Sequence, residues 1–174
     1  MDEKGLYNAI DIAQYVINYS IEKGKPIRNL KLQKLMYYIQ AAFLVEKNTP
    51  CFKESIINWR HGPVVKEVYD KYKDYVDDVI DDKQYGYYDL FLDKEKFKFK
   101  ANFIEFHPEK ISNDDKRVIN EVVDSFIDFD AWTLVYRTLD EDPCKADSKK
   151  DEIISNESIK RYFEENKDRI YAGT

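Results

Sequence analysis

The sequence has few of the residues that usually build catalytic or metal centres. Its 174 residues include two histidines, two cysteines, five glycines and five prolines. Cys51, Cys144, His61 and His107 lack the close-pair spacing of structural zinc sites, and neither cysteine sits in the local signature of a catalytic thiol. A zinc centre or a Cys–His nucleophile is therefore a minor alternative, and we expect no cofactor and no metal.

Long apolar runs and an excess of basic charge are also missing. Charged residues make up 36% of the chain, and no segment approaches the roughly 18 consecutive apolar residues of a membrane span. The net charge of -6 argues against binding along a nucleic-acid backbone, which requires clustered Lys and Arg. The first residues lack the basic-then-apolar form of a secretion signal. We expect a cytoplasmic protein with reduced thiols, no membrane contact and no direct nucleic-acid partner.

Neither of the common glycine patterns that bind nucleotide phosphates occurs. One acidic stretch, residues 77–82, has the D-D-x-x-D form with which isoprenoid synthases bind magnesium and diphosphate. No second acidic motif accompanies it, so we interpret the stretch as a solvated acidic surface. A small metal- or thiol-dependent enzyme is accordingly the weakest hypothesis for function.

Apolar periodicity predicts a mainly α fold: a compact single domain over residues 1–174, with about six helices around a buried central helix and a small β element. The first helix is predicted over residues 8–23. The central helix is predicted over Leu30–Lys47, since it is apolar on nearly every side, and Asn29 is its expected N-cap. Gly62 and Pro63 are predicted to open a third helix, with Pro63 at its first position.

Other local signals complete this outline. Alternating apolar residues predict a strand over 97–103, and Ser112, Asp130 and Ser155 are expected to cap three later helices. The segment from Trp59 to Pro63 is predicted to be a structural turn. Its Trp should be largely buried with a bonded indole N–H, and its Gly should have a positive φ or a close backbone neighbour.

Two lysines and a histidine allow more than one role. Lys31 and Lys34 lie in the first turn of the central helix, where the helix dipole disfavours cations. They either pair with carboxylates of this acidic chain or contact a partner, since local rules are most often broken at functional sites. His61 either anchors the turn before the third helix or presents its imidazole to a partner.

Two blocks about twenty residues apart carry a family resemblance. The first reads K-L-Q-K-L-x-Y-Y-x-Q from Lys31 to Gln40, and the second reads W-x-H-G-P-V-V from Trp59 to Val65, followed by E-V-Y. Together they resemble the Panacea domain, the family of SocA-like antitoxins and phage-associated GepA-type proteins. Residues 119–163 are similar more weakly. Two positions depart from the family pattern: Leu139 replaces a His after Thr138, and Cys144 replaces a Trp after Pro143.

The resemblance implies an antitoxin that binds and neutralises a toxin encoded by a neighbouring gene, in some members by delivering it to a protease, and it implies no enzymatic activity. A phage-encoded protein that modulates its host without a toxin is the main alternative. Residues 85–109 form a variable region in which partner choice could be set. The candidate partner-binding residues are Lys31, Lys34, Tyr37, Tyr38, Arg60, His61, Tyr85, Tyr87 and Tyr88. The expected structural residues of the motifs are Asn29, Leu35, Gln40, Trp59, Gly62 and Pro63.

Overall fold

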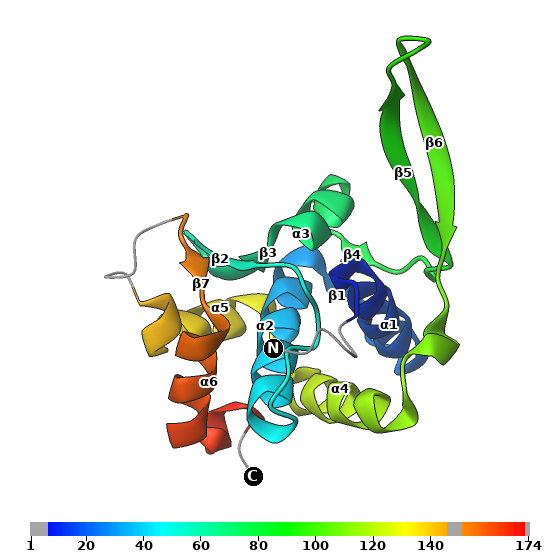
Figure 1. The fold of residues 1–174 in the computed structure, drawn as a ribbon. Helices are drawn as coiled ribbons and strands as arrows, with labels where there is room; N and C mark the ends of the chain where they lie inside the picture. Colours follow the sequence, from blue (N-terminus) through cyan, green and yellow to red (C-terminus); the bar gives the residue numbers. More distant parts are fainter. Residues whose placement is uncertain (1–6, 146–150, 173–174) are drawn as a thin grey trace.

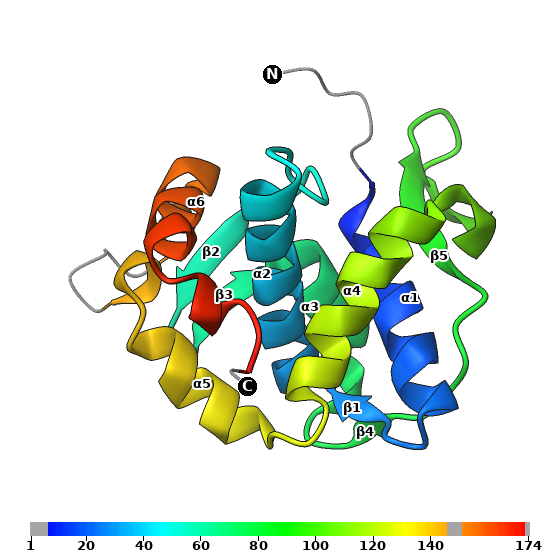
Figure 2. The same ribbon diagram turned by 90° about the horizontal axis from the view of Figure 1, so that it is seen from below.

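A computed structural model describes residues 7–145 and 151–172, and six α-helices lie within these ranges. The predicted single domain over residues 1–174 includes segments outside the described residues and stays a prediction. Helix α2 runs through the centre, with α4 and α6 on opposite sides of it (Figures 1 and 2). The helices are α1 (Ala9–Glu22), α2 (Asn29–Glu46), α3 (Lys66–Tyr72), α4 (Asn113–Phe126), α5 (Ala131–Leu139) and α6 (Asn156–Glu165).

Helix α2 is buried along almost its whole length, which confirms the predicted central helix. Leu35, Met36, Ile39 and Phe43 are at most 2% exposed. The helix contacts the other five helices, so each of its sides faces apolar side chains. A helix surrounded in this way needs no polar face, which explains the nearly continuous apolar sequence from residue 35 onward.

Short strands form three small antiparallel sheets. Strand β1 (Ile27–Arg28) pairs with β4 (Val79–Ile80). A second sheet has the order β3-β2-β7, made of Gly62–Val65, Ile56–Trp59 and Ile153–Ile154. The third sheet is a hairpin of β5 (Gly86–Asp93) and β6 (Lys98–Glu105), which projects from the helical body (Figure 1). The alternating residues from 97 onward therefore do form a strand, but the sequence prediction missed its partner β5.

The caps predicted for three helices are confirmed. Ser112 accepts a hydrogen bond from the Asp115 N–H, Asp130 accepts from the Trp132 and Thr133 N–H groups, and Ser155 accepts from the Ser158 N–H. Asn8 caps α1 in the same way, by accepting from the Ile10 N–H. Each bond satisfies an N–H group that the helix itself leaves unpaired.

Two predictions at helix starts are wrong. Asn29 is not the N-cap of α2 but its first residue, and Arg28 occupies the capping position without a side-chain cap bond. Gly62 and Pro63 do not open a helix; they belong to β3, and α3 begins at Lys66. Pairing with β2 decides this second case. Pro63 is tolerated because β3 is an edge strand with a neighbour on one side only, so the N–H that proline lacks need not be donated to a second strand.

Candidate protein-binding site

The polar residues of the first motif are buried and hold neighbouring segments onto α2. The Gln33 amide oxygen accepts from the Val65 N–H at 2.9 Å, and its NH₂ donates to the Asn29 side chain at 2.9 Å. Asn29 in turn donates to the backbone oxygen of Tyr69 at 3.1 Å. These bonds join α2 to the end of β3 and to α3. The motif therefore positions the surface that these elements form.

Gln40 performs the same task at the other end of α2. Its amide oxygen accepts from the N–H groups of Cys51 and Phe52, and its NH₂ donates to the Phe52 carbonyl. The same NH₂ donates to the Asn156 side chain at 3.2 Å, next to the start of α6. The buried Gln40 side chain thus provides hydrogen-bond partners for backbone groups of residues 51 and 52, which lie in a loop outside the helices and strands.

The two lysines of the motif bond to backbone oxygens. Lys31 Nζ donates to the carbonyls of Ile127 and Phe129, each at 2.6 Å, and so satisfies the C-terminal end of α4, where the helix dipole favours a cation. Lys34 Nζ donates to the Pro63 carbonyl at 3.0 Å. Burial lowers the pKa of Lys34 to about 7. No ion pair with a carboxylate involves either lysine within the described residues, so the pairing prediction is wrong.

Two tyrosines expected at the surface are in the core. Tyr37 and Tyr38 are both 0% exposed, so the expectation that they anchor a partner from the surface is wrong. Tyr38 donates its hydroxyl to Glu141 at 2.9 Å, and its ring stacks on Phe126 with centroids 4.5 Å apart. Burial raises the pKa of Glu141 to about 7, while the Tyr38 hydroxyl and Arg169 act to lower it.

The second motif forms the turn of the β2–β3 hairpin. Gly62 has φ of +87°, as expected for a position that only glycine adopts freely. A Cβ atom there would lie 2.7 Å from the Thr138 hydroxyl and 3.3 Å from Lys34 Nζ, so the hairpin packs directly on α5 and α2. Trp59 is half-buried against Tyr69, with ring centroids 5.1 Å apart, rather than largely buried as predicted. Within the described residues, its indole N–H shows no hydrogen bond.

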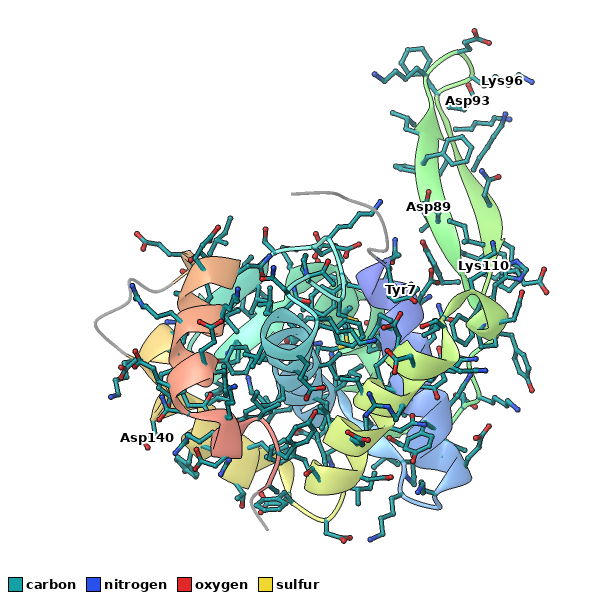
Figure 3. All side chains as sticks on the ribbon, turned by 60° about the horizontal axis from the view of Figure 1, so that its bottom comes forward. Tyr7, Asp89, Asp93, Lys96, Lys110 and Asp140 are labelled. Carbon is teal, nitrogen blue, oxygen red and sulfur yellow. The ribbon has the colours of Figure 1, made fainter. Side chains whose placement is uncertain are left out.

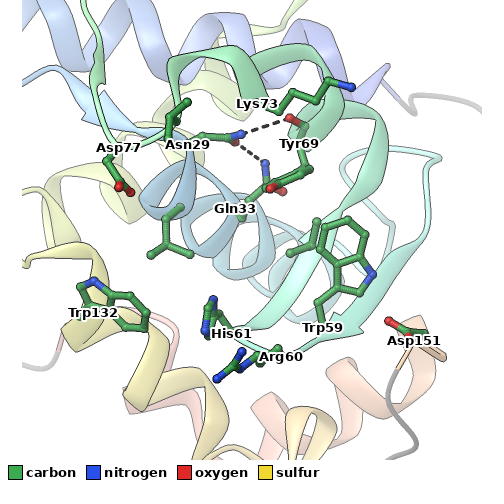
Figure 4. A pocket seen from close by; sticks show the side chains of 13 residues that line it. Asn29, Gln33, Trp59, Arg60, His61, Tyr69, Lys73, Asp77, Trp132 and Asp151 are labelled. Atoms are coloured by element: carbon green, nitrogen blue, oxygen red, sulfur yellow. Dashed lines mark hydrogen bonds between the residues drawn. The ribbon is translucent and has the colours of Figure 1, made fainter.

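Arg60 and His61, at the tip of this hairpin, are exposed at the edge of an open pocket of about 460 Å³ (Figure 4). The His61 ring meets the Trp132 ring of α5 edge to face, with centroids 5.0 Å apart. The pocket thus lies between the β2–β3 turn, the start of α2, helix α3 and the start of α5. Its lining residues are Asn29, Leu30, Gln33, Trp59, Arg60, His61, Val64, Tyr69, Lys73, Val76, Asp77, Trp132 and Asp151.

The pocket has the composition of a protein-binding site. Trp59, Tyr69, His61 and Trp132 supply aromatic rings, and Arg60 supplies a guanidinium. Trp, Tyr and Arg are the residues that most often carry binding energy at protein interfaces. Trp132 is 48% exposed and is the second residue of α5, two positions after the N-cap Asp130. Sequence analysis missed Trp132 and Tyr69 as site residues, although both lie in segments that resemble the family.

The rim of the pocket includes a strained aliphatic residue. Val76 is 75% exposed and has φ of +51°, a conformation that a β-branched residue rarely adopts. Such strain is often retained where a residue contacts a ligand or a partner. The acidic stretch 77–82 begins directly after it, and Ile80 of that stretch is buried in the β1–β4 pair.

The three tyrosines of the variable region do not line this pocket and do not form one patch. Tyr85 is 66% exposed before β5, Tyr88 is 65% exposed on one face of the β5–β6 hairpin, and Tyr87 is half-buried on the opposite face. Lys71 Nζ lies 5.5 Å from the centre of the Tyr87 ring, so Tyr87 faces α3.

The structure offers little support for the enzyme hypothesis. In residues 7–145 and 151–172, no group of three or more His, Cys, Asp or Glu side chains is placed to hold a metal ion. Cys51 and Cys144 are both buried, and burial raises the pKa of the Cys144 thiol to about 12. A nucleophilic cysteine needs the opposite shift. No helix of the described chain is long and apolar enough to cross a bilayer.

The chain belongs to the family described as "Antitoxin SocA-like, Panacea domain", whose sequence profile matches residues 32–145. A segment of 61 residues is 39% identical to Antitoxin SocA of Caulobacter vibrioides (strain NA1000 / CB15N). That alignment covers 33% of this chain and 32% of the relative, so the two chains align over about a third of their lengths. No solved structure matches the chain.

Proposed function

We propose that this protein is an antitoxin that neutralises a cognate toxin by direct binding, and that the pocket beside Arg60 and Trp132 receives a segment of the toxin. Family membership supports the general role. The observation that carries the proposal is the meeting of three family segments at one open, aromatic-lined pocket. Neutralisation by binding requires no cofactor and no turnover.

The chemistry of the pocket indicates which toxin segment fits. The rings of Trp59, Tyr69 and Trp132 favour an inserted apolar or aromatic side chain. Arg60 at the edge can donate two parallel hydrogen bonds to a carboxylate. Lys73 and Asp77 add one charge of each sign on another side of the pocket (Figure 4). Since the polar bonds of α2 fix the walls, the pocket is formed before the toxin binds, which lowers the entropic cost of binding.

The test is co-expression of this chain with each neighbouring open reading frame in a bacterial host. One neighbour alone should arrest growth, this chain should restore it, and the two proteins should co-purify or the toxin should be removed by proteolysis. If no neighbour is toxic, the antitoxin proposal fails and the host-modulating alternative takes its place. Rescue without binding or degradation also contradicts the proposal.

Single substitutions test the pocket itself. Trp132→Ala and Arg60→Ala should each weaken toxin binding on the order of tenfold or more, as truncation of an interface anchor does. Tyr85→Ala is the matched control, because Tyr85 is a 66% exposed aromatic residue that neither lines the pocket nor contacts Trp132. Equal loss of binding in Trp132→Ala and Tyr85→Ala would show that the toxin does not use the pocket.

A further inference from the structure

The β5–β6 hairpin has one face that is apolar over three successive cross-strand pairs, with Glu105 opposite Gly86 at the base of that face. Residues directly opposite each other in an antiparallel pair lie on the same face. The register therefore places three apolar cross-strand pairs on one face: Tyr88 with Phe103, Leu90 with Ala101, and Leu92 with Phe99. The Tyr88 and Phe103 rings are 5.1 Å apart, in agreement with this assignment. The charged pairs, such as Asp93 with Lys98, lie on the opposite face.

This apolar face is open to solvent. Tyr88, Leu90, Leu92, Phe99 and Phe103 are 65%, 69%, 45%, 79% and 53% exposed. With about 200 Å² for a full aromatic side chain, these five side chains expose roughly 500–600 Å². That area is at the upper end of the apolar patches found on monomers, which are often functional. An isolated two-stranded hairpin is also only marginally stable in water, so a covered face would stabilise it.

The described part of the chain does not cover the face. The base of the hairpin is fixed: the Gln84 N–H donates to the Asn18 side chain at 2.7 Å, and Phe106 is buried. Tyr87, on the polar face, is turned toward Lys71 of α3. The apolar face consequently points away from the helical body, and the hairpin extends well beyond it (Figures 1 and 3). Another molecule is then a suitable occupant of the face.

Charge identifies a second copy as a suitable occupant. The chain carries a net charge of -6, so two copies repel each other over most of their surfaces. Residues 85–105 are an exception, because Lys94, Lys96, Lys98 and Lys100 balance Asp89, Asp93, Glu95 and Glu105. The hairpin is therefore neutral overall, and the three apolar pairs themselves bring no charge into a self-contact, since Glu105 lies beyond them at the base.

The order of residue sizes along the face is also symmetric about its middle pair. From base to tip, the pairs are large, small and large, with Leu90 and Ala101 in the middle. A two-fold axis through the middle pair would place the tip pair of one copy, Leu92 and Phe99, against the base pair of the other copy, Tyr88 and Phe103. Contacts of this kind, in which the same patch serves both copies, are the commonest in oligomers. Two such faces would bury roughly 1,000–1,200 Å² in total, which is at the low end of specific interfaces.

We propose that two copies of this chain associate through the apolar face of the β5–β6 hairpin to form a concentration-dependent dimer. The polar face, with the Lys100–Asp93 ion pair at 2.6 Å, remains in solvent. The proposal is independent of toxin binding, because the pocket beside Trp132 lies elsewhere on the molecule and stays open in the dimer.

The first test is the mass of the purified chain, without any toxin, by analytical ultracentrifugation over a concentration series. The mass should rise from 20.8 kDa toward twice that value. Leu90→Asp should weaken the dimer at least tenfold. Phe91→Asp is the matched control, since it adds the same charge at the next residue but on the opposite face, and it should leave dimerisation within about threefold of wild type.

A second variant separates loss of contact from loss of the hairpin fold. Leu90→Lys should also be monomeric, and a mixture of Leu90→Asp and Leu90→Lys chains should form a heterodimer, because the two-fold axis brings the two positions 90 together. A wild-type chain that stays monomeric, a dimer that tolerates Leu90→Asp, equal loss in Phe91→Asp, or no recovery in the mixture would each overturn the proposal. If wild type is monomeric and Leu90→Asp instead abolishes toxin binding, the face belongs to the toxin.

Discussion

Replacement of Gly62 by Ala should destabilise the fold for two separable reasons. The backbone at Gly62 has φ of +87°, which costs a residue with a Cβ about 1–2 kcal/mol. The new methyl group would also lie 2.7 Å from the Thr138 hydroxyl, and overpacking of this kind costs about 1–3 kcal/mol. We therefore expect Gly62→Ala to lower the free energy of unfolding by roughly 2–5 kcal/mol, as measured by urea denaturation.

A double-mutant cycle and a control separate the two causes. In a Thr138→Ala background the clash with the hydroxyl is gone, so Gly62→Ala should cost the backbone part and whatever the 3.3 Å approach to Lys34 Nζ adds, and the coupling free energy should be about 1–3 kcal/mol. Gly24 has φ of +70°, and no atom lies within 4 Å of the position that a Cβ would take there, so Gly24→Ala should show the backbone part alone. If Gly62→Ala costs no more than Gly24→Ala, or if the cycle shows no coupling, the packing of the hairpin on α5 is wrong.

Three further predictions concern α2 and a helix cap. Burial lowers the pKa of Lys34 from 10.5 to about 7 in the folded state, so between these pH values the unfolded chain binds one more proton than the folded chain, and the free energy of unfolding should rise with pH. In urea denaturation, wild type should gain about 2 kcal/mol relative to Lys34→Met between pH 7 and 9. A difference between the two proteins that stays constant with pH would refute this. Leu35→Ala should cost about 2–5 kcal/mol in the same assay, and a loss below about half a kcal/mol would contradict the central position of α2. Ser155→Ala should cost about 1 kcal/mol in thermal or urea unfolding, whereas Ser155→Asp, which keeps a side-chain oxygen that can accept from the Ser158 N–H, should cost little; equal costs would exclude the cap bond as the cause.

The sequence predicted best those features that are set by neighbouring residues. The caps at Ser112, Asp130 and Ser155 depend on N–H groups two or three residues away, and all three were correct. The burial of α2 followed from a long apolar run. The signal for β5 is weaker, because Phe91 interrupts the alternation of Tyr88, Leu90 and Leu92 with Asp89 and Asp93, and a pattern this short is equally compatible with a variable region.

The failures concern features that depend on distant partners. Lys31 donates to backbone carbonyls that lie 96 and 98 residues further along the chain. A hydrogen bond between a side chain and such a distant backbone oxygen cannot be predicted from the local sequence. Gly62 followed by Pro63 is equally compatible with the start of a helix and with an edge strand, and only pairing with β2 decides between them. The pocket was missed as a unit for the same reason, since Trp132 reaches His61 only through the packing of α5.

The burial of the motif residues changes what a family match indicates about partners. Four motif residues point inward and bond to the backbone or to buried side chains, so they hold the scaffold together and do not contact a partner directly: Gln33, Lys34, Tyr38 and Gln40. We therefore expect partner choice to depend on residues that the scaffold presents but does not need, such as Arg60 and Trp132 at the pocket. Exchange of such residues between family members should transfer partner preference without loss of stability, whereas exchange of the inward-pointing residues should affect stability first.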